Sequence, residues 1–142
     1  MKLCHDQFMD INFISKWVSF GFFSVSAILH FYFFYIESFL YQKSDGYKYF
    51  KVAPQDHKAT RVWAFNQGIY NFFLALQMSV GLVFVRLGEQ KTAGLLVGLS
   101  GLTMIGAGIA LYFSAKHLRQ AALVQMIPPA LGFLFLSMHA IR

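Results

Sequence analysis

Four long apolar runs constrain this chain more than any other feature of its 142 residues. They cover about residues 17–41, 62–85, 92–113 and 121–141, and each could cross a hydrocarbon core roughly 30 Å thick as a helix. Only helices and closed barrels satisfy their backbone hydrogen bonds in lipid, and runs of this length suit helices. Charged residues form 13% of the chain, about half of their share in soluble domains. The sequence therefore predicts an all-α fold, an integral membrane four-helix transmembrane bundle without a β-sheet.

The first sixteen residues are too polar to span a membrane. Two lysines and two aspartates carry charge there, and the apolar residues between them suit a turn or helix at the membrane interface. The apolar run that follows is longer than the roughly 7–15 residues of a signal-peptide core, so we expect a retained span. We therefore divide the chain into an N-terminal interfacial segment, residues 1–16, and one four-span transmembrane domain, residues 17–142.

Basic residues are spread almost evenly over the two ends of the predicted bundle. Four spans put both termini at one end, where the termini and the 86–91 hairpin carry five Lys and Arg residues; the 42–61 and 114–120 segments carry seven. The positive-inside rule then predicts that these two segments are cytoplasmic and that both termini lie outside. The net charge of +6 suits anionic lipid headgroups, because the basic residues lie between apolar runs. We expect no nucleic-acid partner.

The second run begins with the most polar stretch inside any span. Asn66, Gln67 and Asn71 carry amides that hydrocarbon cannot satisfy, at a cost of roughly 2–7 kcal/mol for each unpaired group. Asn66, Tyr70 and Gln77 share one face at helical spacing. Other spans must therefore turn polar groups toward this stretch.

Polar residues of spans one and four are predicted to meet it. His30 and Glu37 lie two helical turns apart on one face, and the antiparallel arrangement of spans one and two brings Glu37 to the depth of Asn66. Span four begins at the same end. We predict one polar cluster near the 42–61 segment, in which Glu37 is neutral or shares a proton with His30, because burial disfavours charge. The candidate ligand-binding residues are His30, Glu37, Asn66, Gln67, Tyr70, Asn71 and Gln125.

Each part of this pattern also has a purely structural interpretation. An ionisable residue inside a membrane span usually has a function. Glu37, however, lies near the end of its span, where a neutral carboxyl could bond to Tyr or Asn and have only a structural role. The amides could simply hold helices together, at about 0.6 kcal/mol per hydrogen bond. Gly94 and Gly98 form a GxxxG pattern, which indicates close helix packing in lipid. We therefore expect Gly98→Leu or Gly101→Leu to reduce the folded yield in detergent.

Sequence signatures of several common chemistries are missing. The chain has no CxxC, HExxH, Walker A or G-x-S-x-G pattern, and no span carries two histidines four residues apart. The single cysteine, Cys4, cannot form an internal disulfide. No metal site is predicted. The cofactors and catalytic residues stay unknown, and whether the chain is an enzyme stays open.

Three motifs resemble those of a known family. They are His30 with Glu37-Ser38-Phe39, Ala64-Phe65-Asn66-Gln67-Gly68-Ile69-Tyr70-Asn71, and Val124-Gln125 with Pro129-Ala130. Over roughly residues 27–140 the chain resembles the small bacterial integral membrane proteins grouped as domain of unknown function 1304. It departs by Phe65, where that family usually has alanine, and by Tyr41, where tryptophan is common. The resemblance implies four spans, a multi-pass protein of the bacterial inner membrane, and no assigned activity.

Three functions from different classes fit these observations. In the first, the polar cluster binds or converts a lipophilic small molecule. In the second, the chain is a small proton-coupled exporter that works as a dimer, with Glu37 as the shared proton and substrate site. In the third, it is a structural membrane protein without a ligand. Membrane lipids are expected partners in all three, and a lipophilic small molecule and a second copy of the chain are further candidates.

Overall fold

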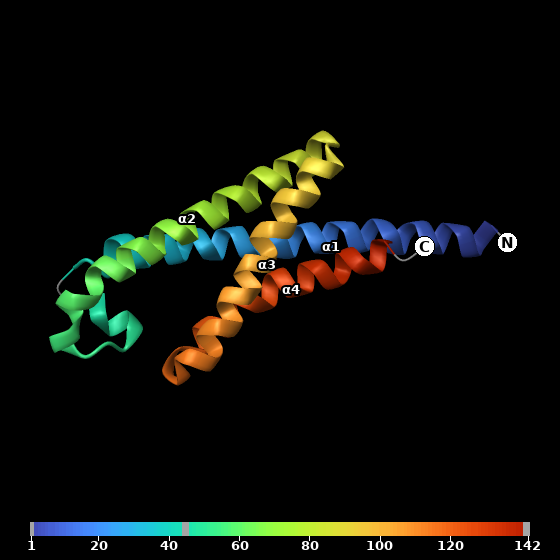
Figure 1. Cartoon of the computed structure of the whole chain (residues 1–142). Coiled ribbons are helices and arrows are strands. Elements are labelled where there is room, and N and C mark those ends of the chain that lie inside the picture. Colours follow the sequence, from blue (N-terminus) through green and yellow to red (C-terminus); the bar gives the residue numbers. More distant parts are fainter. Residues whose placement is uncertain (1, 44–45, 141–142) are drawn as a thin grey trace.

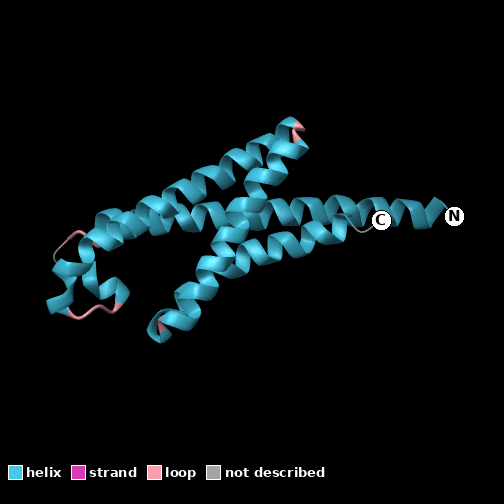
Figure 2. Ribbon diagram, in the orientation of Figure 1, coloured by secondary structure: helices cyan, strands magenta, loops and turns pink. Residues whose placement is uncertain are grey.

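The computed structural model describes residues 2–43 and 46–140, and within them the chain forms helices and turns without a strand (Figure 2). The four long helices are α1 (Lys2–Tyr35), α2 (His57–Leu87), α3 (Gln90–Ser114) and α4 (Arg119–Ala140). Within the described residues, four stretches are long and apolar enough to cross a membrane: Ile14–Leu40, Pro54–Leu87, Gln90–Ser114 and Lys116–Met138. The predicted fold class, an integral membrane four-helix bundle, is therefore confirmed.

Shorter helical segments join the long helices. α1 continues directly into a π-helical segment, η1 (Ile36–Leu40), where the backbone N–H of Tyr41 donates to the carbonyl of Ile36 at 2.7 Å. The 3-10 segments η2 (Gly46–Phe50) and η3 (Pro54–Asp56) precede α2, and η4 (Lys116–Leu118) precedes α4. The segment 1–16 is helical from Lys2 onward and continuous with span one; its place at the membrane interface stays a prediction.

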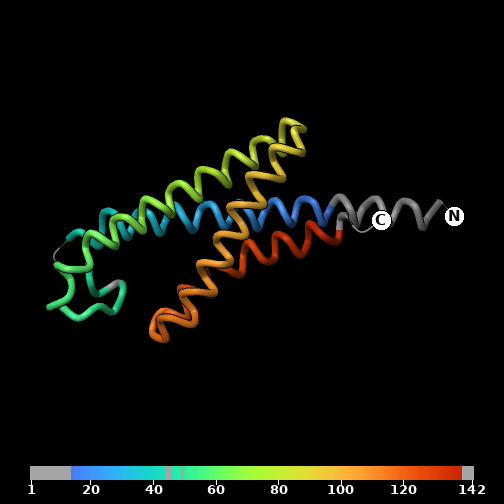
Figure 3. Tube along the Cα trace, in the orientation of Figure 1, coloured from blue at the N-terminus to red at the C-terminus, as the bar shows by residue number. Residues whose placement is uncertain are grey.

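The helices pack as a ring in which each contacts its neighbours in the chain and α1 also contacts α4. α2 and α3 form a hairpin (Figure 3). It turns at Gly88, whose φ of 85° lies in the left-handed region that favours glycine. The start of α1 and the end of α4 lie toward the same end of the molecule, as four spans require (Figure 1). The connection between α1 and α2 lies at the opposite end, and the candidate site is found there.

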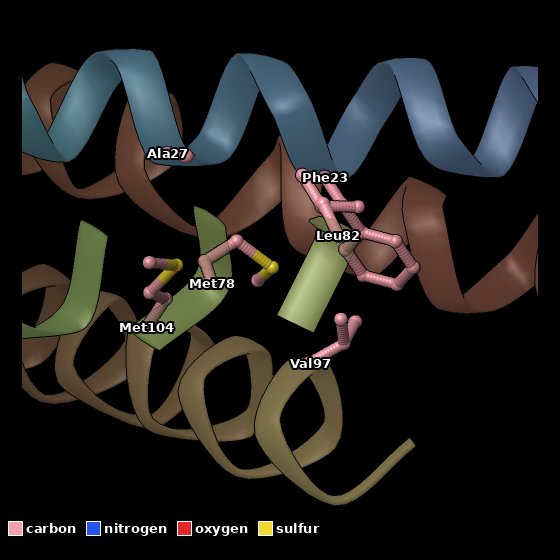
Figure 4. Close-up of a cluster of buried hydrophobic side chains, with 6 residues drawn as sticks. All are labelled: Phe23, Ala27, Met78, Leu82, Val97 and Met104. Carbon is pink, nitrogen blue, oxygen red and sulfur yellow. The ribbon is translucent and has the colours of Figure 1, made fainter. Parts of the chain in front are cut away.

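Six buried side chains from the first three helices form the apolar centre: Phe23, Ala27, Met78, Leu82, Val97 and Met104 (Figure 4). Phe133 of α4 packs against them, with its ring edge-on to Phe23 at 5.1 Å between centroids. On the outer faces, Ile28 and Leu102 are 66% and 63% exposed. Large apolar side chains on the outside suit a bundle surrounded by lipid, because lipid tails solvate them as well as a protein core would.

Two hydroxyl groups join α1 to α4. Ser19 Oγ donates to the backbone carbonyl of Gly132 at 2.8 Å, and Ser15 Oγ donates to that of Phe135. Both serines are buried. A β-carbon on Gly132 would lie 2.6 Å from the ring of Phe23, so the absence of a side chain there lets the two helices approach to hydrogen-bonding distance.

The glycines of α3 contact neighbouring helices at other positions than the GxxxG pattern predicted. A β-carbon on Gly94 or Gly98 would meet no heavy atom of the described residues within 4 Å, and both glycines line a cavity of about 440 Å³. The expectation that Gly98 mediates close helix packing is therefore wrong, because this face of α3 borders a cavity. Gly101 does pack closely, since a β-carbon there would lie 2.8 Å from the ring of Phe133.

Candidate functional site

The candidate site is built around the end of span one, where the helix changes from α to π. Segment η1 carries Glu37 and Ser38, and Ser38 is buried with no partner for its Oγ among the described residues. Single π turns inside α-helices are rare and frequently occur at functional sites. The wider turn moves Glu37 and Ser38 off the regular α-helical spacing of α1.

Gly68 lets α2 approach η1 closely. A β-carbon at this position would collide with Ser38 Oγ and would lie 3.1 Å from both Glu37 Cβ and the backbone nitrogen of Ser38. Asn71 lies three residues further along α2 and therefore on the same face of the helix. The absence of a side chain at Gly68 thus sets the distance at which Asn71 can reach Glu37.

Asn71 and Glu37 form the central hydrogen bond of the site. Nδ2 of Asn71 donates to Oε2 of Glu37 at 2.7 Å. Asn71 is only 3% exposed, and its Oδ1 has no partner among the described residues. The side-chain amide of Gln42 donates to the backbone carbonyls of Glu37 and Arg61, at 3.2 and 3.1 Å, and so ties the end of η1 to the start of α2.

A pocket of about 510 Å³ lies beside this hydrogen bond. Residues from all four helices and from the segments η1, η2 and η4 line it. Most of the wall is apolar, with Phe33, Ile36 and Leu111 among its members, and no Lys, Arg or His is found among the described residues that line it. The polar members are Glu37, Gln67, Asn71, Ser114 and Gln125.

Four of the seven predicted site residues, Glu37, Gln67, Asn71 and Gln125, thus meet around one pocket. His30 lies behind its wall. The His30 side chain is completely buried, its Nδ1 donates to the carbonyl of Ser26 at 2.9 Å, and its ring packs edge-on against Phe33. Nε2 of His30 has no partner among the described residues.

Asn66 and Tyr70 are exposed, Tyr70 at 65%, and neither lines the pocket, so the predicted convergence does not extend to them. The reason is the rotation of α2. Each residue turns the helix by about 100°, so residues beside the buried stripe point outward. The buried stripe of this helix is Gly68, Asn71, Ala75, Met78, Gly81 and Leu82.

Sequence reasoning did not assign a role to Gly68 or Ser38. A signal for Gly68 was present, because glycine inside a helix costs about 1 kcal/mol relative to alanine and therefore needs a packing reason. Ser38 carried no such signal, since its burial depends on the π turn and on the approach of α2. Ser114 also lines the pocket and was not predicted.

The connection between α1 and α2 folds over this end of the bundle. Tyr41 is buried, its hydroxyl hydrogen-bonds to Thr60 Oγ1 at 2.5 Å, and its carbonyl accepts a hydrogen bond from His57 Nε2 at 2.8 Å. The rings of Phe50 and His57 each pack edge-on to Tyr41, with centroids 5.0 Å away. These contacts hold Phe50 where it lines the pocket.

Replacing Glu37 by glutamine is expected to leave the fold intact. A glutamine oxygen can accept the same hydrogen bond from Asn71, and the side chain keeps its size. Glu37→Ala, in contrast, removes the acceptor and should lower the free energy of unfolding by about 1–3 kcal/mol. Thermal unfolding of both variants in detergent checks this. Equal losses in the two variants would show that the carboxylate, and not the hydrogen bond, stabilises the bundle.

A family model matches most of the chain. The model described as "Protein of unknown function (DUF1304)" matches residues 24–137, a range that contains every residue of the pocket. No curated protein and no solved structure matches the chain.

Proposed function

The chain belongs to the DUF1304 family of proteins of unknown function, and we propose that it binds or converts a lipophilic small molecule in the pocket beside Glu37. One observation carries this proposal: five polar side chains from three helices and η1 line a pocket of about 510 Å³ whose other walls are mostly apolar. Small-molecule sites typically have about 300–1,000 Å³ and combine apolar walls with a few polar groups that orient the ligand. The pocket has both properties.

The chemistry of the walls suggests how such a ligand would lie. Its apolar body would contact Phe33, Ile36 and Leu111, and its polar head would face Glu37 and Asn71. A carboxyl group inside a membrane span is costly and usually functional, which favours a role for Glu37 beyond helix packing. The chain is a multi-pass membrane protein. We propose that its membrane is the bacterial inner membrane, as the family resemblance implies.

Filling the pocket tests the proposal. Ala107 of α3 lines the pocket, so Ala107→Phe should occupy part of its volume and reduce the amount of any copurified small molecule by about tenfold, a loss of about 1.4 kcal/mol in binding. Mass spectrometry of protein purified in a mild detergent measures this. Leu102→Phe, on the outer face of the same helix, is the matched control and should retain the ligand. Equal occupancy in wild type and both variants would place the ligand elsewhere.

The absence of a cation among the described lining residues also favours a proton-coupled exporter as the second candidate, because Glu37 is then free to exchange a proton with substrate. Flux into liposomes driven by a pH gradient tests it, and Glu37→Gln should abolish that flux. A chain that shows neither a copurified molecule nor flux would instead be a structural membrane protein.

A further inference from the structure

The polar atoms left without partners around Glu37 are mainly hydrogen-bond acceptors. Three buried side-chain atoms have no partner among the described residues: His30 Nε2, Ser38 Oγ and Asn71 Oδ1. Asn71 Oδ1 can only accept. Nδ1 of His30 must carry the proton that it donates to the Ser26 carbonyl, so Nε2 of the neutral ring can also only accept. Two of the three unpartnered atoms are therefore acceptors, and the third, Ser38 Oγ, can accept or donate.

In the pocket too, acceptor atoms are left free, beside the amide of Gln67 and the hydroxyl of Ser114, which can both donate and accept. Glu37 accepts one hydrogen bond at Oε2, and the described residues provide no partner for its Oε1. The Gln125 amide donates one hydrogen to the Met104 carbonyl at 3.4 Å, and its oxygen is free to accept from a ligand. The amide of Asn71 is similarly directed at Glu37.

The charge of the pocket also favours a ligand that donates hydrogen bonds. The lining groups from α1, η1, η2, α2, α3, η4 and α4 include one titratable side chain within the described residues, the carboxyl of Glu37. No basic side chain offsets it there. A buried charge is stable only when it is paired, so a ligand with a positive head would supply the countercharge that the described lining residues lack, together with N–H groups for the free acceptors.

We propose that the ligand class is lipophilic amines, an inference that rests on the proposed function. An alkylammonium ion pairs directly with the carboxylate of Glu37. A neutral amine can instead take the proton of a neutral Glu37 carboxyl, and both routes give the same ion pair without another reactant. The N–H groups of the head donate to Glu37 and to the amide oxygens, and the alkyl chain lies along Phe33, Ile36 and Leu111.

Three probes with the same chain and different heads test this class: dodecylamine, 1-dodecanol and dodecanoate. The purified protein is placed in phosphatidylcholine nanodiscs, which carry no net charge, and saturable binding of radiolabelled dodecylamine is measured with each probe as competitor. We expect dodecylamine to compete at least about tenfold better than dodecanol, as the loss of one charged hydrogen bond implies, and dodecanoate not to compete.

The outcomes separate this inference from the proposed function. If labelled dodecanol or dodecanoate binds saturably and as tightly as the amine, and Ala107→Phe weakens that binding, the pocket binds ligands and the amine class is wrong. If no labelled probe binds saturably, the pocket is not a binding site for such amphiphiles, and both the proposed function and the amine inference are wrong.

A matched pair of variants tests whether the carboxyl of Glu37 is the group that binds the amine head. Glu37→Gln should weaken dodecylamine binding at least about tenfold and leave dodecanol binding within about twofold. Glu89→Gln makes the same chemical change at an exposed residue of the α2–α3 hairpin and should alter neither. Unchanged amine binding in Glu37→Gln would overturn the proposal. Retained dodecanol binding shows that the variant is folded, and the ranking of probes on wild-type protein needs no variant.

Discussion

The Gly68→Ala variant is expected to unfold at a lower temperature than the wild type, with a loss of about 1–3 kcal/mol in the free energy of unfolding. Helix propensity alone predicts the opposite sign, because alanine is favoured over glycine in a helix by about 1 kcal/mol. The loss comes from packing: the new β-carbon would collide with Ser38 Oγ and would lie 3.1 Å from Glu37 Cβ and from the backbone nitrogen of Ser38. Thermal unfolding in detergent measures it.

Two further variants test whether the loss of stability comes from packing against Ser38. Gly98→Ala, where an added β-carbon meets nothing within 4 Å, should be neutral or should stabilise the protein by up to about 1 kcal/mol. The double variant Gly68→Ala/Ser38→Gly removes the colliding hydroxyl and should recover part of the loss. If Gly68→Ala is as stable as Gly98→Ala, α2 does not approach η1 as closely as described.

The Gly108→Leu variant is expected to lose most of its folded yield in detergent, with a destabilisation of about 3 kcal/mol or more, at the upper end of the overpacking range. Gly108 of α3 faces α4, and a β-carbon there would lie 2.7 Å from Met126 Cβ and 3.1 Å from the backbone oxygen of Ala122. Neither atom can move without moving the α4 backbone. The two helices would therefore have to separate.

Gly94→Leu is the matched control, because it makes the same change on α3 where the added β-carbon has no neighbour within 4 Å. It should give a yield close to wild type on size-exclusion chromatography. Gly101→Leu should resemble Gly108→Leu, since its β-carbon would meet the Phe133 ring at 2.8 Å. A monodisperse Gly108→Leu protein with an unchanged melting temperature would contradict the packing of α3 on α4.

The fold could be predicted from the sequence because lipid leaves few choices. A run of about twenty apolar residues must satisfy its backbone internally, and a helix does this without a partner. The GxxxG pattern was less informative, since small residues permit a close approach without requiring it. Gly94 and Gly98 face a cavity, whereas Gly101 and Gly108, which have no such spacing, contact α4.

The sequence predicted the depth of the candidate site in the membrane, but it predicted only partly which side chains point into the site. Antiparallel spans put Glu37, Gln67, Asn71 and Gln125 at one level, and all four line the pocket. Depth does not say which way a side chain points, so Asn66 and Tyr70 were included although they face outward. The π turn could not be predicted from a helical period of 3.6, because contacts with α2 accompany it.

The contacts between Tyr41 and Thr60 and between Gln42 and Arg61 close the chain between α1 and α2 into a loop with fixed ends. The entropy of closing such a loop grows only with the logarithm of its length, by about 0.6 kcal/mol for each doubling. Insertions or deletions between these ends are therefore nearly neutral for the bundle. They are not neutral for the pocket, because Phe50 belongs to the loop, so changes in loop length would alter the shape of the pocket while the four helices stay as they are.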